Sequence, residues 1–210
     1  VGTVASCNAT GTLSAADARR AHPDLMERTR NVGTDAAAKK FINDVNLEAL
    51  DREIRASKTI AAGRGLVAVN VMRAVADYAR LVRQSCESGA DVIVVGAGLP
   101  LDLPELTADF PQVAIVPILS DARGIALVLK KWERKGRLPD AVVIEHPKHA
   151  GGHLGAAKIA DLDDPRFDFE NVLPETLTLL RAMGVEGRIP LIVAGGINSP
   201  ERVRQVTALG

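Results

Sequence analysis

The residues most suited to chemistry lie in one glycine-rich segment between His149 and Gly155. His153 follows Gly151 and Gly152, and a pair of glycines allows the backbone to approach a flat ligand closely. An imidazole that is neutral near pH 7 can accept a proton from a substrate or orient an anionic one. From the residues alone a surface histidine on a flexible loop is the favoured alternative, and the catalytic role depends on the motif compared below. We treat His153 as the candidate catalytic residue.

Three histidines also raise the question of a metal site. His146, His149 and His153 have the spacing i, i+3, i+7, which would place them on one helical face. Pro147 and the glycine pair oppose a helix in this segment. Neither a cysteine nor a carboxylate cluster accompanies the histidines, so we expect no metal site.

Glycines follow two of the apolar runs. Gly195 and Gly196 stand shortly before Ser199-Pro200, an N-cap and first-position pair that opens a helix. Backbone N–H groups beside a helix N-terminus commonly bind phosphate, so we expect this glycine pair to do so. Gly96 and Gly98 either admit a ligand or only form a tight turn.

Two polar residues at strand ends have a structural alternative. Asn70 carries amide donors and acceptors suited to the polar edge of a ligand, or it caps the helix that follows. Ser120 either hydrogen-bonds a ligand or caps its own following helix, and capping is the interpretation we favour.

Short runs rich in Val and Ile alternate with amphipathic segments along the chain. Runs that are apolar throughout are typical of parallel strands buried on both faces. The expected strands are residues 66–71, 91–95, 113–119, 141–145 and 191–194, with 2–5 a weaker sixth. The expected helices are 47–62, 74–88, 122–135, 173–183 and one opened by Ser199-Pro200. Residues 156–172 are expected to form a loop insertion, and 12–44 an irregular excursion.

The regular spacing of the four strands that begin near residues 66, 91, 113 and 141 fits successive βα units in a single domain over residues 1–210. The step to the strand at 191 is larger because it holds the expected insertion. A (β/α)8 barrel can use the loops after all its strands, whereas an open sheet concentrates its site at one switch point. Here several strand ends are followed by chemically distinctive loops, and the late glycine pair suits the phosphate site of a barrel. The predicted fold class is therefore α/β, a (β/α)8 TIM barrel.

Composition excludes several functions. The 26 Lys and Arg residues balance 26 Asp and Glu residues, which argues against a nucleic-acid or polybasic membrane partner. Aromatic residues make up 3% of the chain, too few for base-stacking platforms. No apolar run approaches the ~18 residues of a membrane span. The two cysteines form no disulfide framework, which indicates a reducing, cytoplasmic location.

Four segments together resemble the nitronate monooxygenase family, FMN-dependent TIM barrels once called 2-nitropropane dioxygenases. These segments are Val-Ala-Val-Asn-Val-Met (67–72), Gly-Ala-Gly-Leu-Pro (96–100), His-Ala-Gly-Gly-His-Leu-Gly (149–155) and Ile-Val-Ala-Gly-Gly-Ile (192–197). They stand in the family's order, with similar spacing, across essentially the whole chain. The Ala-Gly-Gly-His-x-Gly element is the specific one.

The resemblance implies an FMN cofactor and a role for each candidate residue. His153 matches the family's catalytic base, which removes a proton from the carbon next to a nitro group. The residues implied to contact FMN are Asn70, Gly96, Gly98, His146, Gly151, Gly152, Gly195 and Gly196. His146 stands where many relatives carry a flavin-contacting Gln. The implied partners are a nitronate or nitroalkane and molecular oxygen, and self-association is left open.

The resemblance also implies that the family's first strand precedes Val1 and that its eighth follows Gly210. The chain would then be a fragment that holds strands two to seven of the barrel.

Four functions remain open at this point. The leading one is FMN-dependent oxidation of alkyl nitronates with oxygen. An NAD(P)H-dependent flavin oxidoreductase of the same family, such as an enoyl-thioester reductase, would share every candidate residue. A flavin-free lyase or isomerase acting on a sugar phosphate is disfavoured, because Glu145 is the sole carboxylate at a strand terminus. A non-catalytic remnant is the fourth.

Overall fold

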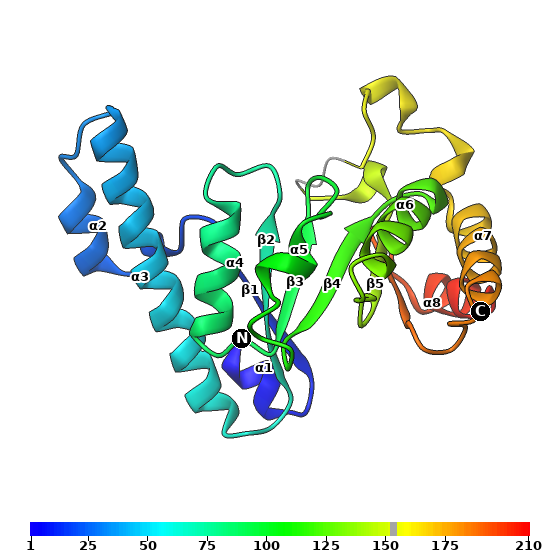
Figure 1. Cartoon of the computed structure of the whole chain (residues 1–210), viewed down its shortest axis with the longest axis horizontal. Coiled ribbons are helices and arrows are strands. Elements are labelled where there is room, and N and C mark those ends of the chain that lie inside the picture. Colours follow the sequence, from blue (N-terminus) through cyan, green and yellow to red (C-terminus); the bar gives the residue numbers. More distant parts are fainter. Residues whose placement is uncertain (152–154) are drawn as a thin grey trace. The chain divides into compact units, whose positions relative to one another are not determined.

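The computed structural model describes residues 1–151 and 155–210, which divide into two compact units (Figure 1). The first unit comprises Val1–Val94 and Glu105–Ala114, and the second comprises Val95–Pro104 and Ile115–Gly210. The short helix α5 (Leu103–Leu106) bridges the two in sequence. That residues 1–210 form a single domain stays a prediction.

Parallel strands form the centre of the first unit. β1 (Thr10–Ser14) pairs in parallel with β2 (Leu66–Met72), and Ser14 lies opposite Asn70. The ladder continues where Asp91 N donates to Val67 O at 2.9 Å, immediately before β3 (Val92–Gly96). Val67, Ala68 and Val69 are completely buried, as the apolar run in the sequence predicts.

The start of the chain differs from the prediction. Residues 2–5 belong to the helix α1 (Gly2–Ser6), and the strand lies further on, at Thr10–Ser14. α1 packs closely on the long helix α3 (Ala36–Ala61), since a Cβ on Gly2 would stand 2.7 Å from Ile60 Cβ. The sequence pattern does not reveal β1, because alternate residues of this strand are exposed and Leu13 is its one large apolar residue.

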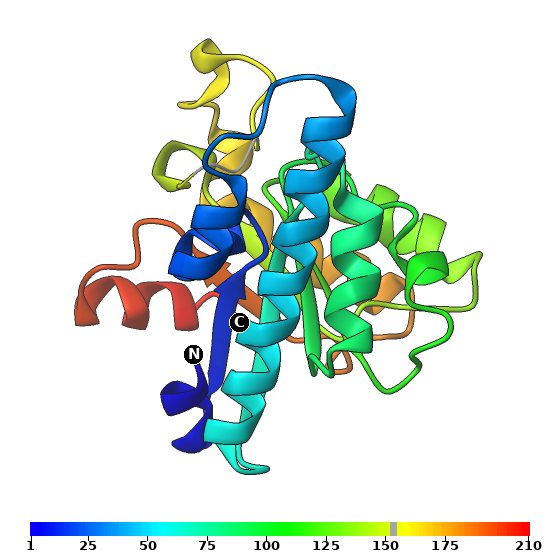
Figure 2. The same cartoon turned by 90° about the vertical axis from the view of Figure 1, so that its left-hand side faces the viewer.

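Four further helical segments complete the first unit: η1 (Ala18–Ala21), α2 (Pro23–Thr29), α3 (Ala36–Ala61) and α4 (Tyr78–Glu87). α3 begins well before the predicted residue 47, because the Asp35 side chain caps it by accepting a hydrogen bond from Ala38 N at 2.7 Å. α4 begins later than predicted, at Tyr78. α3 and α4 lie side by side (Figures 1 and 2).

The second unit continues the same βα pattern. β4 (Ala114–Leu119), β5 (Val142–Glu145) and β6 (Leu191–Ala194) run parallel in that order. The helices are α6 (Ala122–Glu133), α7 (Phe169–Ala182) and α8 (Pro200–Thr207). Three short 3-10 turns precede α7: η2 (Pro147–His149), η3 (Ile159–Asp161) and η4 (Pro165–Phe167). The last two, with the first residues of α7, occupy the segment predicted as an insertion.

One apolar stripe anchors α6. Its buried residues are Ile125, Val128, Leu129 and Trp132, which recur at helical spacing. Trp132 is fully buried and donates its indole N–H to Pro100 O at 3.0 Å. Burying each of these side chains stabilises by roughly 1.5–3 kcal/mol, which outweighs the ~1 kcal/mol expected of a helix cap.

The observed class is α/β with six strands, and strand order follows chain order within each unit. This agrees with part of a TIM barrel, and the strands expected before Val1 and after Gly210 stay a prediction. Among the described residues, no helix has both the length and the apolar character needed to cross a membrane.

Candidate functional site

The candidate site lies in the second unit, where three strands end. Ser120 follows β4, His146 follows β5 and Gly195 follows β6. The registers place Leu119 opposite Ile144 and Glu145 opposite Ala194. Because parallel strands present their carboxyl ends at one edge, the residues that follow them gather there.

A pocket of about 250 Å³ at this edge brings several predicted residues together, and we call it the histidine pocket. It is lined by His146, Lys148, His149, Leu162, Asp163, Asp168, Phe169, Gly195, Gly196 and Arg202. Of the residues predicted to contact a cofactor, it contains His146 and both glycines of the late pair.

Hydrogen bonds fix the ring of His146. Its Nδ1 accepts from Lys148 N at 3.3 Å, and its Nε2 lies 3.4 Å from Asp168 Oδ1. An Nδ1 that accepts carries no proton, so in the neutral ring the proton resides on Nε2 and faces the Asp168 carboxylate. The edge of Phe169 meets the ring with centroids 5.8 Å apart. His146 is thus an oriented, mostly buried side chain, 9% exposed.

Gly195 and Gly196 form a turn, which we call the glycine cradle, in which a larger residue at either position would be strained. Gly195 and Gly196 have φ values of 85° and 77°, in the left-handed region. A Cβ on Gly195 would lie 3.1 Å from the carbonyl oxygen of His146. A Cβ on Gly196 would lie 2.9 Å from Cδ2 of His149, closer than packed carbon atoms approach. The imidazole of His149 therefore lies against the backbone of this pair.

Two cations of the histidine pocket are held by exposed carboxylates. Lys148 Nζ forms an ion pair with Asp163 Oδ1, and Arg202 Nη1 donates to Glu170 Oε1 at 2.8 Å. The hydrogen bond from Lys148 lowers the pKa of Asp163, and the one from Arg202 lowers the pKa of Glu170. Exposed pairs of this kind are weak, about 0–1 kcal/mol. Lys148 and Arg202 can therefore exchange these carboxylates for a bound anion at a small cost in free energy.

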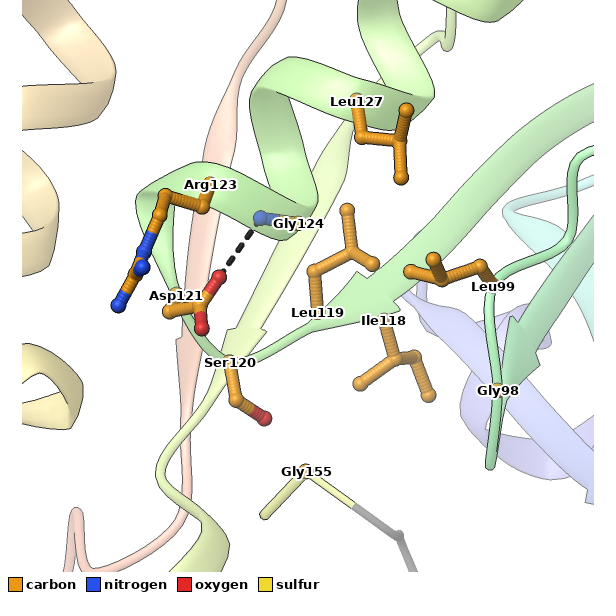
Figure 3. Close-up of a pocket in the computed structure, with 10 residues that line it drawn as sticks. All are labelled: Gly98, Leu99, Ile118, Leu119, Ser120, Asp121, Arg123, Gly124, Leu127 and Gly155. Atoms are coloured by element: carbon orange, nitrogen blue, oxygen red, sulfur yellow. Dashed lines mark hydrogen bonds between the residues drawn. The ribbon is translucent and has the colours of Figure 1, made fainter. Parts of the chain in front are cut away.

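A second cavity of about 410 Å³ lies beside the end of β4, and we call it the serine pocket (Figure 3). It is lined by Gly98, Leu99, Ile118, Leu119, Ser120, Asp121, Arg123, Gly124, Leu127 and Gly155. Asp121 caps α6 by accepting a hydrogen bond from Gly124 N at 2.6 Å. The prediction that Ser120 caps this helix is wrong, because its neighbour already does so.

The two glycines after β3 differ in position. Gly96 is the last, buried residue of β3, whereas Gly98 lines the serine pocket. Ala97 and Gly98 both have positive φ, at 56° and 128°. A positive φ at alanine is strained, and such strain concentrates at ligand sites.

The remaining predicted residues lie elsewhere. Asn70 belongs to the first unit, where it is exposed and its carbonyl oxygen accepts from Ala15 N at 3.0 Å. It does not cap the next helix, whose N-cap residue is Asp77. Gly151 is exposed, and no described atom lies within 4 Å of a Cβ built on it. Gly152 and His153 lie outside the described residues.

The sequence prediction missed seven residues of the histidine pocket, among them Lys148, His149, Asp168 and Arg202. His149 stood within the motif and had been weighed only as a metal ligand. The sequence could have indicated Arg202, because it is a basic residue in the first turn of the helix that follows the glycine pair. Nothing in the pattern singled out Asp168. Within residues 1–151 and 155–210, no group of three His, Cys, Asp or Glu side chains is placed to hold a metal ion.

Comparisons with known proteins agree on one family. Residues 4–210 match the family model described as nitronate monooxygenase. A nitroalkane oxidase structure from Streptomyces ansochromogenes is similar over 100% of this chain and 59% of its own, with 16% identity and a TM-score of 0.58. FabK from Thermotoga maritima is similar over 76% of this chain and 44% of its own, with 20% identity and a TM-score of 0.53. The chain thus spans about half the length of these structures. None of the curated proteins matches it.

Proposed function

Because the chain belongs to the nitronate monooxygenase family, we propose that it is part of an FMN-dependent oxidoreductase that oxidises alkyl nitronates with molecular oxygen. The observation that carries the proposal is the Gly195–Gly196 cradle, with His149 against it and Lys148 and Arg202 in the same pocket. This is the donor chemistry that a phosphate monoester requires.

The residues present fit the phosphate of FMN. A left-handed glycine pair without side chains leaves backbone N–H groups accessible, and α8 begins a few residues later at Pro200. Lys148 and Arg202 supply positive charge once they leave Asp163 and Glu170. Gly195, Gly196, His149, Lys148 and Arg202 would therefore hold the phosphate.

The protein's own contribution to the reaction is placement and proton transfer. Bound flavin would supply the electron acceptor for the nitronate. His153 would remove the proton from the carbon next to the nitro group when a neutral nitroalkane is the substrate. His146, oriented by Asp168, would fix the turn Pro147–His149, which comes just before the glycine-rich motif in the sequence.

The experiment that tests this proposal is a visible absorption spectrum of the purified natural protein, followed by oxygen uptake with a nitronate. We expect bound flavin bands and nitronate-dependent oxygen consumption. A colourless protein that cannot be loaded with FMN would overturn the proposal. Flavin that NAD(P)H reduces, without oxygen uptake on nitronates, would instead establish the NAD(P)H-dependent oxidoreductase, which an enoyl-thioester substrate would then test.

A further inference from the structure

The side chain of Ser120 is a buried hydroxyl without a hydrogen-bond partner. The residue is 6% exposed, and no group of residues 1–151 or 155–210 hydrogen-bonds its Oγ. A buried polar group that makes no hydrogen bond destabilises the fold, and such groups are rare in native proteins. The hydroxyl is not needed for the helix cap, which Asp121 provides. Its retention therefore calls for a ligand.

The surroundings of Ser120 show what kind of ligand fits. Ser120 and Ile118 project to one side of β4, away from Leu119 and Leu127 (Figure 3). Gly155 packs against Ser120 so closely that a Cβ on it would collide with Oγ. The hydroxyl therefore stands beside apolar side chains and bare backbone. A mostly apolar cavity with a few placed polar groups suits a flat heterocycle.

Charge argues against a second phosphate in the serine pocket. The Asp121 carboxylate occupies the N-terminus of α6, where an anion would otherwise bind. Its Oδ2 also lies 4.0 Å from Arg166 Nε, which partly engages that cation. An uncharged ring avoids repulsion by this carboxylate.

The strand register sets the distance between the two pockets. Leu119 of β4 lies opposite Ile144 of β5, and Glu145 of β5 lies opposite Ala194 of β6. Ser120, at the end of β4, is therefore separated from Gly195, at the end of β6, by two strand spacings. Two strand spacings are ~10 Å. The ribityl chain that joins the phosphate and the ring of FMN is of comparable length. A phosphate in the histidine pocket therefore lets the ring reach the serine pocket.

We propose that Ser120 Oγ hydrogen-bonds a nitrogen or carbonyl oxygen on the ring of bound FMN; this inference rests on the function proposed above. Ser120 thereby orients the ring, while the glycine pair holds the phosphate. The bond also satisfies a hydroxyl for which residues 1–151 and 155–210 provide no partner.

The test compares Ser120→Ala and the similarly sized Ser120→Cys with the natural protein. The matched control is Ser85→Ala, because Ser85 is also buried, at 0% exposed, but donates its hydroxyl hydrogen to Leu81 O at 2.7 Å. We measure the melting temperature without flavin, the Kd for FMN and the positions of the visible flavin bands. Removing one hydrogen bond should weaken FMN binding roughly tenfold in both Ser120 variants and shift the bands. The melting temperature should not fall for Ser120→Ala, whereas it should fall for Ser85→Ala.

The outcomes separate this inference from the proposed function. Unchanged FMN affinity and unchanged bands in both Ser120 variants would overturn the role of Ser120 and leave the flavoprotein standing. A drop in melting temperature for Ser120→Ala as large as that for Ser85→Ala would make Ser120 a structural residue and also overturn the role. A natural protein that binds no FMN would remove the proposed function, and this inference with it.

Discussion

The imidazole of His149 lies against Gly196, so that a Cβ on this glycine would stand 2.9 Å from His149 Cδ2. A one-carbon side chain at Gly196 must therefore displace the histidine as well as adopt a left-handed backbone. The two effects can be separated, because the chain holds other left-handed glycines in open surroundings.

Replacement of Gly196 by Val should abolish most FMN binding. The side chain would fill the cradle and push against His149, whereas the strain of the positive φ alone costs about 1–2 kcal/mol of stability. Gly187→Val is the matched control, since Gly187 has a φ of 75° and no described neighbour within 4 Å of a built Cβ. Equilibrium titration with FMN checks the prediction. Equal FMN affinities in the two variants would show that the cradle is not the phosphate site.

Replacement of His153 by Asn should leave FMN bound and slow the turnover of a neutral nitroalkane. Loss of a general base typically costs ~10²–10⁴-fold. A preformed nitronate needs no proton removal, so its oxidation should be slowed much less. Steady-state oxygen uptake with both substrates measures the difference, and His22→Asn in the first unit serves as the histidine control. Equal large losses on both substrates would instead assign His153 to substrate binding.

Replacement of Glu170 by Gln should tighten FMN binding about two- to fivefold. This is the range expected when an exposed carboxylate no longer competes with the phosphate of FMN for Arg202. The change frees Arg202, which Glu170 now holds at 2.8 Å. The gain should shrink as salt is added. Glu186→Gln is the control, because Glu186 has a similarly lowered pKa beside Arg181 and lies outside the histidine pocket. A loss of affinity in Glu170→Gln would mean that Glu170 positions Arg202 rather than competing for it.

Alkaline pH should destabilise the fold through Cys86. Burial raises the pKa of this thiol to about 11 from an ordinary 9.0. Between these values the unfolded chain loses the proton and the folded chain keeps it, so the free energy of unfolding falls as pH rises. The expected loss is about 2–3 kcal/mol relative to Cys86→Ala. Urea denaturation from pH 8 to pH 11 checks this, and parallel curves for the two proteins would contradict it.

Buried strands were the most predictable part of the fold. The run at residues 191–194 matches β6 at both ends, and β2 through β5 lie within one residue of their predicted bounds. β3 and β4 are apolar throughout because both of their faces are covered. β6 is equally apolar in sequence, although its Ile192 is 48% exposed. β1 was missed for the opposite reason, since only one of its faces is buried.

Apart from His146, the candidate site was predictable only where it depends on the backbone conformation of glycine. Gly195, Gly196 and Gly98 were found because glycine is required at a positive φ. Arg202 and Asp168 lie in the histidine pocket through the packing of α7 and α8, which no local pattern encodes. Ser120 was misassigned because it stands next to Asp121, a residue type that caps helices well, and it is the Asp121 carboxylate that accepts from Gly124 N.

Neighbouring strands in each unit are also neighbours along the chain, which affects how the protein can fold while it is being synthesised. Within each unit, a strand pairs with the strand that precedes it in the chain. A ribosome releases such strands in the order in which they pair, so each arrives at an edge that already exists. β5 can dock on β4, and β6 on β5, while the rest of the polypeptide is still being made. Assembly of the histidine pocket must then wait until Gly195, Gly196 and α8 emerge.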